Sequence, residues 1–225
     1  RVDSLANPDL NPAEIDWLLN EAQLIFVKQR MGMNNQKRSG FETSQKRIDD
    51  LGNLVIKFPL QPALTPTEVS PGVFEISLQN TLYSYMFLLD AWVDVEIETD
   101  CLKKTPLKFV QHDDFTETFR DPFNNDSLEF IPYNIGRSSS NNGRSIYIYT
   151  TKTIPSVYVE YLKIPSRVSL GTYTYIDGVT YPATTLETAE HTHKEIVDIA
   201  CLLAAQNTQS PEYLQLRNQK LLINE

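Results

Sequence analysis

Apolar residues recur at helical spacing near the start of the chain. Asn11, Pro12 and Glu14 fall at the N-cap, first and third positions of a helix that runs to about Met31. Its buried stripe is expected to contain Ile15, Leu18, Leu19, Ala22, Ile25, Phe26 and Gln29. A second periodic segment, with Phe41, Ile48, Leu51 and Val55 on one face, stops at Phe58-Pro59. Together the two segments predict a helical hairpin over residues 1–58.

The apolar period changes from helical to two after residue 59, and prolines and turn residues become frequent. Strands are predicted in five segments: Val73–Leu78, Ala91–Glu98, Ser145–Lys152, Val157–Ile164 and Tyr173–Ile176. Asp177-Gly178 is typical of a tight turn between strands. Leu82–Leu89 fits either a strand or a short helix. Residues 59–183 are therefore expected to form a mainly antiparallel β domain.

Helical spacing returns at the end of the chain. Thr184 and Glu187 have the spacing of a capping box, in which two side chains bond each other's backbone at a helix start. One face of this helix is expected to hold Leu186, Ala189, His193, Ile196, Ala200 and Leu203. Ser210-Pro211-Glu212 begins a second, shorter helix. Residues 184–225 thus predict a helical pair that packs with the N-terminal hairpin, and the whole chain is expected to have an α+β fold.

The composition disfavours several functional classes. The 225 residues carry a formal net charge of −9, which disfavours a general nucleic-acid binder because such proteins neutralise phosphates with lysine and arginine. Cys101 and Cys201 lie far apart without metal-ligand spacing, so we expect free thiols. No apolar run reaches the roughly 18 residues of a membrane span. No membrane partner is expected.

The distribution of charge along the chain suggests contacts between subunits. Acidic residues outnumber basic ones between Asp90 and Glu129, whereas basic residues dominate around the predicted hairpin. Opposite charges on one chain suit head-to-tail packing of identical subunits, although ordinary solvated faces are the alternative. The candidate subunit-contact residues are Lys28, Arg30, Lys37, Arg38, Lys46, Arg47, Asp94, Glu96 and Glu98. A candidate contact loop contains Arg137, Asn141 and Arg144.

Catalytic patterns are weak. His191 and Glu195 can share one face of a helix, but no HExxH motif is present, and His112-Asp113-Asp114 predicts a polar turn. No glycine-rich phosphate-binding loop of a recognisable kind occurs. We therefore expect no enzyme activity, cofactor or metal, with a metal hydrolase based on His191 and Glu195 as a remote alternative.

Three helical segments resemble structural proteins of the neck and tail region of crAss-like bacteriophages. The segments are Leu10–Gln23, Phe41–Leu51 and His193–Ala200. The resemblance implies a ring or connector protein between portal and tail, expected to form a homo-oligomeric ring of twelve copies in the virion. Its partners are then itself, the portal and other neck or tail proteins, with DNA only as transient cargo of the channel. A virion β module that binds a peptide or glycan is the alternative from another class.

Overall fold

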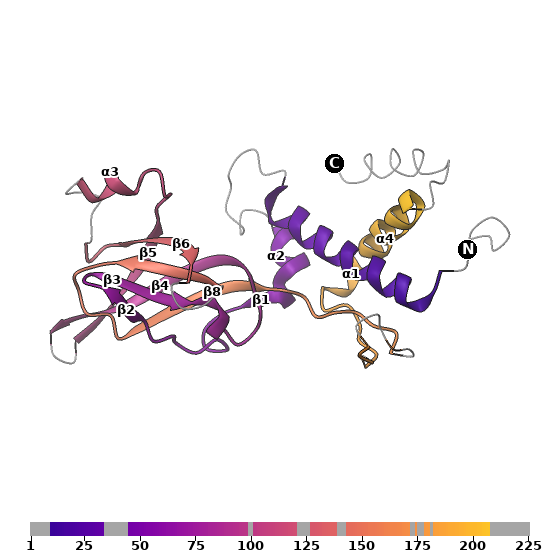
Figure 1. Ribbon diagram of the computed structural model, residues 1–225, viewed down its shortest axis with the longest axis horizontal. Coiled ribbons are helices and arrows are strands. Elements are labelled where there is room, and N and C mark those ends of the chain that lie inside the picture. The colour runs from indigo at the N-terminus through magenta and orange to yellow at the C-terminus, as the bar shows by residue number, and fades with distance from the viewer. Residues whose placement is uncertain are drawn as a thin grey trace. The chain divides into compact units, whose positions relative to one another are not determined.

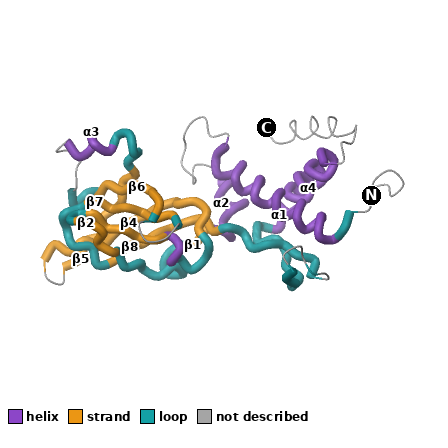
Figure 2. Tube along the Cα trace, in the orientation of Figure 1, coloured by secondary structure: helices purple, strands orange, loops and turns teal. Residues whose placement is uncertain are grey.

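The computed structural model describes residues 10–33, 45–98, 101–120, 127–138, 143–171, 174, 178–180 and 182–207. It is a mixed α+β protein with helices towards both ends of the chain and a curled sheet between them (Figures 1 and 2). The chain divides into two compact units. Unit 1 combines residues 1–54 with 165–225, and unit 2 is Val55–Ile164. The expected division at 58/59 and 183/184 therefore places part of the chain differently, because residues 165–183 belong with the helices.

Unit 2 is built on one curled sheet, in which eight strands are described. The strands are β1 (Val55–Ile56), β2 (Thr67–Ser70), β3 (Val73–Ser77), β4 (Tyr85–Glu98), β5 (Cys101–Phe109), β6 (Ile131–Arg137), β7 (Arg144–Tyr149) and β8 (Ser156–Lys163). Their order across the sheet is β1-β8-β4-β5-β6-β7-β3-β2. The described neighbours pair antiparallel except β5 and β6, which are parallel and are connected through helix α3 (Phe115–Arg120). A mainly antiparallel β region is thus confirmed.

The interior of the curled sheet is the core of unit 2. It contains the alternate apolar residues that the two-residue period predicts, among them Val93, Val95, Ile146, Ile148, Val157 and Val159. The ambiguous segment Leu82–Leu89 enters β4 at Tyr85, so most of it is strand. β5 was not predicted because Cys101–Phe109 contains three lysines and a proline and lacks a two-residue apolar period, and Thr105 is the one residue in it that is buried.

Unit 1 is organised around helix α1 (Pro12–Lys28), which continues as a π-helical turn (Gln29–Met33). The predicted start is confirmed: the Glu14 carboxylate accepts a hydrogen bond from the Asn11 backbone N–H at 2.9 Å. Helix α4 (His193–Asn207) packs against α1. Of the predicted stripes, Leu18, Ala22, Phe26, Ile196 and Ala200 are buried. The prediction was wrong for Gln29, which is exposed, and it missed the buried Asp16, Gln23 and Val27.

Polar side chains on α1 form hydrogen bonds with Val168 and Leu170, in the segment that follows β8. The Asn20 side chain donates to the Val168 carbonyl oxygen and accepts from the Val168 N–H, both at 2.8 Å. The Asp16 carboxylate, 1% exposed, accepts from the Leu170 N–H at 3.1 and 3.2 Å. These bonds satisfy backbone groups of a segment without regular structure, which explains why residues after 164 belong to the helical unit.

The second predicted helix ends earlier than expected. Helix α2 (Gln45–Leu51) gives way to a 3₁₀ turn (Gly52–Leu54), and Val55 already belongs to β1. The prediction of a helix up to Phe58 was wrong because Gly52 is a poor helix former and the β-branched pair that follows it joins the sheet. Phe41 and the connection between the two helices lie outside the described residues.

The predicted capping box at Thr184 is also wrong. The Thr184 N–H donates to the Ser169 carbonyl oxygen at 2.9 Å, and the Glu187 carboxylate accepts from the Ser166 N–H at 2.8 Å. Tertiary hydrogen bonds therefore use both residues, and α4 starts only after a 3₁₀ turn (Glu190–Thr192). The predicted helix from Ser210 lies outside the described residues.

The predicted turn at Asp177-Gly178 falls only partly within the described residues. Gly178 has a φ of +79°, and an isolated bridge joins Thr174 to Thr180. Residues 175–177 lie outside the description. Among the helices that are described, none is long and apolar enough to cross a membrane.

The core of unit 2 predicts how stability changes at alkaline pH. Burial raises the pKa of the Tyr133 phenol to about 12 from an ordinary 10.0, and the negative charges of Tyr85 and Asp90 act in the same direction. The folded state therefore holds more protons than the unfolded state between these values, so the free energy of unfolding falls as pH rises above 10. Denaturant titrations should show that Tyr133→Phe removes up to about 2–3 kcal/mol of this fall.

At neutral pH, Tyr133→Phe should change the free energy of unfolding by less than about 1 kcal/mol, because the ring and its packing remain. An alkaline fall as steep in the variant as in the wild type would show that Tyr133 is not its source.

Candidate assembly surfaces

The basic candidate contact residues around the predicted hairpin lie in different environments. Lys28 is exposed in the last turn of α1, whereas Arg30 is held inside unit 1. The Arg30 guanidinium contacts Asp50 at 2.7 Å and both carboxylate oxygens of Glu195 at 2.7 and 2.9 Å. Lys37 and Arg38 lie outside the described residues, and Lys46 and Arg47 are described only as backbone of α2.

Arg30 joins three helical segments into one ionic cluster. Besides its two carboxylate contacts, it lies 4.9 Å from the centre of the Phe26 ring. The ring nitrogen Nε2 of His191 lies 2.8 Å from the other oxygen of Asp50, whose side chain is 4% exposed. A cation shared between two carboxylates holds both side chains in place through charge-assisted hydrogen bonds. The role of Arg30 within the chain is therefore structural, and its contact with another subunit stays a prediction.

The same cluster contains the residues of the metal-hydrolase alternative. His191 contacts Asp50, and Glu195 contacts Arg30. A guanidinium beside Glu195 opposes a metal cation at this position, because like charges repel. Within the part of the chain that the structure describes, no group of three or more His, Cys, Asp or Glu residues could hold a metal ion.

Asp94 belongs to an aromatic cluster on the outer side of the sheet. It is 7% exposed, and its carboxylate accepts a hydrogen bond from the Tyr158 hydroxyl at 2.9 Å. This hydrogen bond raises the pKa of the Tyr158 phenol, since the carboxylate stabilises the protonated form. The Tyr158 ring stacks on Trp92 with centroids 5.5 Å apart and meets Phe58 edge-on at 5.2 Å. Asp94 is thus bound within its own unit.

Glu96 lies where β4 and β5 extend beyond their neighbours. Pairing of β8 with β4 ends at Asp94, and pairing of β6 with β5 begins only at Leu107. Residues 95–98 and 101–104 pair with each other there and are called the ribbon (Figure 1), and the Glu96 N–H also donates to the Thr153 carbonyl oxygen at 3.1 Å. Ile97 and Leu102 are 46% and 54% exposed, and Glu96 is exposed beside them. The side chain of Glu98, also a candidate, lies outside the description.

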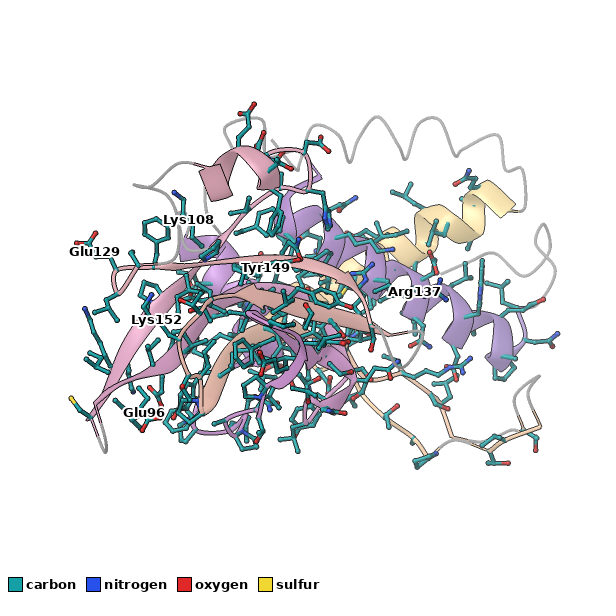
Figure 3. All side chains as sticks on the ribbon, turned by 60° about the vertical axis from the view of Figure 1, so that its left-hand side comes forward. Glu96, Lys108, Glu129, Arg137, Tyr149 and Lys152 are labelled. Carbon is teal, nitrogen blue, oxygen red and sulfur yellow. The ribbon has the colours of Figure 1, made fainter. Side chains whose placement is uncertain are left out.

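The candidate contact loop follows the end of the β6–β7 pair. Arg137 and Arg144 are paired in register and exposed, while Asn141 lies outside the described residues. Burial raises the pKa of Tyr85, and the Leu88 N–H and the Arg144 cation act against this rise. Arg144 therefore lies near the Tyr85 phenol. Arg137 and Glu96 are well apart in Figure 3, so these two candidates do not share one site.

A second exposed apolar surface was not predicted. It consists of Leu60, Leu82, Tyr83 and Ile164, which are 55%, 53%, 42% and 44% exposed and which we call the apolar patch. Sequence analysis placed Ile164 in a predicted strand and Leu82 and Tyr83 in an ambiguous segment, whereas in the structure all four residues lie outside the strands. The proline-flanked Leu60 was the only local signal, since a large apolar side chain in a turn has no strand or helix face to bury it.

Hydrogen bonds from the interior hold the apolar patch in place. The side-chain oxygen of Gln61, a residue 2% exposed, accepts from the Leu82 N–H at 2.8 Å and from the Tyr161 hydroxyl at 3.2 Å. The Tyr161 oxygen accepts from the Tyr83 N–H at 3.1 Å, and the Ile164 N–H donates to the Ser84 carbonyl at 2.8 Å. The two loops and the end of β8 are therefore fixed to one another, so the backbone under the exposed side chains needs little ordering on contact.

The exposures and contacts above define exposed apolar and charged surfaces on the sheet of unit 2. Comparison with models of known protein families gives no match, and comparison with characterised proteins gives none either. Functional inference therefore depends on the surfaces themselves.

The ionic cluster predicts a large difference between two neighbouring cations. Arg30→Met removes the charge between Asp50 and Glu195 but keeps a similar apolar stem, so the free energy of unfolding should fall by about 3 kcal/mol. Lys28→Met, at an exposed position in the same helix, should change it by less than about 0.5 kcal/mol. Chemical denaturation of both variants measures the difference. Equal stabilities would mean that the cluster contributes no net stability.

Proposed function

We propose that the protein is a structural, non-catalytic subunit of a bacteriophage neck or tail ring that joins portal and tail. In this role many copies associate around the particle axis, in contact with the portal or other rings, and leave a channel for DNA or ejected proteins. The helical segments of unit 1 supply the sequence resemblance to such proteins, including the hairpin and the C-terminal helical pair expected there. The proposed location is the virion.

The ribbon is the observation that supports this proposal most directly. Exposure of two large apolar side chains on the ribbon is unfavourable in water. Ile97 and Leu102 are in this position. Contact with another chain removes this disadvantage, as expected for a subunit whose final state is an assembly.

The alternative of a peptide- or glycan-binding β module has less support from the aromatic cluster. A sugar ring needs an open aromatic face, but Trp92 and Tyr158 stack on each other. Lys104 Nζ also lies 5.6 Å from the centre of the Tyr158 ring. The cluster therefore uses its rings for contacts within unit 2.

Location in the particle tests the proposed function. Antibody Fab fragments against the purified protein should label intact virions at the junction of head and tail, and averaged images of that junction should show a ring of twelve copies. Labelling of the capsid surface or of the tail fibres, or absence of the protein from purified virions, would contradict the proposal. Fab fragments against a capsid protein serve as the control for specific labelling.

A further inference from the structure

Unit 2 is a continuous segment inserted into unit 1. Residues 1–54 precede it and residues 165–225 follow it, and both of these segments belong to unit 1. The two ends of unit 2 lie side by side, because Val55 in β1 pairs antiparallel with Leu162 in β8. Partners in such a pair have Cα atoms only about 4.5–5.5 Å apart. The chain therefore enters and leaves unit 2 at neighbouring points.

The hydrophobic core of unit 2 consists of residues of unit 2. Every member of the buried cluster inside the curled sheet, from Ile56 to Tyr161, lies within Val55–Ile164. The hydrogen bonds that the Gln61 side chain makes also join residues of this unit. A segment of this length falls within the usual domain size of about 50–250 residues. Unit 2 thus has the core that a separately folding domain needs.

Unit 1 has contacts of its own that join its two parts. The Asn20 side chain binds the backbone of Val168, and the Arg30 guanidinium binds the Glu195 carboxylate. Each of these contacts links a residue that precedes unit 2 to a residue that follows it. Helices α1 and α4 also pack together, and Ile196 of α4 is fully buried. The fold of unit 1 is therefore held by its own side chains.

We infer that unit 2 is an inserted module that unfolds and refolds independently of unit 1, so that the chain contains two cooperative units. A unit with its own core and its own hydrogen bonds can open while the rest of the chain stays folded. Because the ends of unit 2 are adjacent, the folded module connects the two parts of unit 1 as a short turn would. When unit 2 opens, it becomes a long loop, and the entropy of closing a loop grows only slowly with its length.

This division separates two features of the chain. The segments that resemble neck and tail proteins belong to unit 1, whereas the ribbon and the apolar patch belong to unit 2. A partner that binds only the folded form of unit 2 then stabilises that unit by mass action and leaves the stability of unit 1 unchanged. The inference goes beyond the proposed function and does not rest on it, because it concerns the folding of the chain alone.

Hydrogen–deuterium exchange of the full chain, measured by mass spectrometry, tests the inference. Ile148 in β7 and Ile196 in α4 form a matched pair, since both are isoleucines that are 0% exposed. Ile148→Ala leaves a cavity in the core of unit 2 and should accelerate exchange of the slowest amides of β3, β4 and β7 by at least about thirtyfold. Exchange in α1 and α4 should stay within about twofold of the wild type. Ile196→Ala should have the reverse effect.

Two milder variants keep the test usable if an alanine variant does not fold. Ile148→Val and Ile196→Val each remove a single buried carbon and should accelerate exchange by about two- to tenfold, in their own unit only. Val69→Ser serves as the control, because this side chain is 46% exposed on the edge strand β2. It should leave the slowest amides of both units unchanged.

The possible results distinguish failure of the inference from failure of the proposed function. If either substitution accelerates exchange in both units by the same factor, the chain is one cooperative unit and the inference is overturned. A substitution that leaves exchange in its own unit unchanged also contradicts it, because the buried isoleucine would then not stabilise that unit. Fab labelling away from the neck refutes the proposed function and leaves the inference standing.

Discussion

The hydrogen bond between Gln61 and Tyr161 is the interaction on which the exposed end of unit 2 depends. Both side chains are almost completely buried, and together they satisfy the backbone N–H groups of Leu82 and Tyr83. A buried amide or phenol that loses its partner destabilises the fold by roughly 1–3 kcal/mol. The loops at this end are thus held by the core and do not depend on their own weak propensities. Their apolar side chains remain exposed on a backbone that the core holds.

Local signals in the sequence predicted the structure well where the structure is decided locally. Asn11, Pro12 and Glu14 lie within four residues of one another, and the helix that they begin is found as expected. Alternation in β3, β7 and β8 likewise reflects a core on one side of the sheet. Thr184 and Glu187 show the limit, because residues 15 and 21 positions away in the sequence bind them and remove their capping role.

Long-range partners also limit how well contact residues can be predicted from the sequence. In the sequence Asp94 is one more acidic residue in an acidic segment, yet Tyr158, 64 positions later, binds it. Arg30 is one more basic residue near the hairpin, yet Glu195, 165 positions later, binds it. The surface charges of a protein are those that remain after such long-range pairs have formed. Glu96 is in this remaining group, and its exposure could not be distinguished from that of Asp94 without the fold.

The outer edge of β5 has a further consequence for the protein before it meets a partner. Among the described strands, β6 covers this edge only from Leu107 onwards and Thr105 is buried, so residues 101–104 present backbone groups that another strand could join. Lys103 and Lys104 place charge along this edge, and Pro106 lacks a backbone N–H to donate. Strand addition, and with it the growth of fibrils or amorphous precipitate, is therefore disfavoured. The ribbon can present apolar side chains at its end while its edge protects the newly made chain from aggregation.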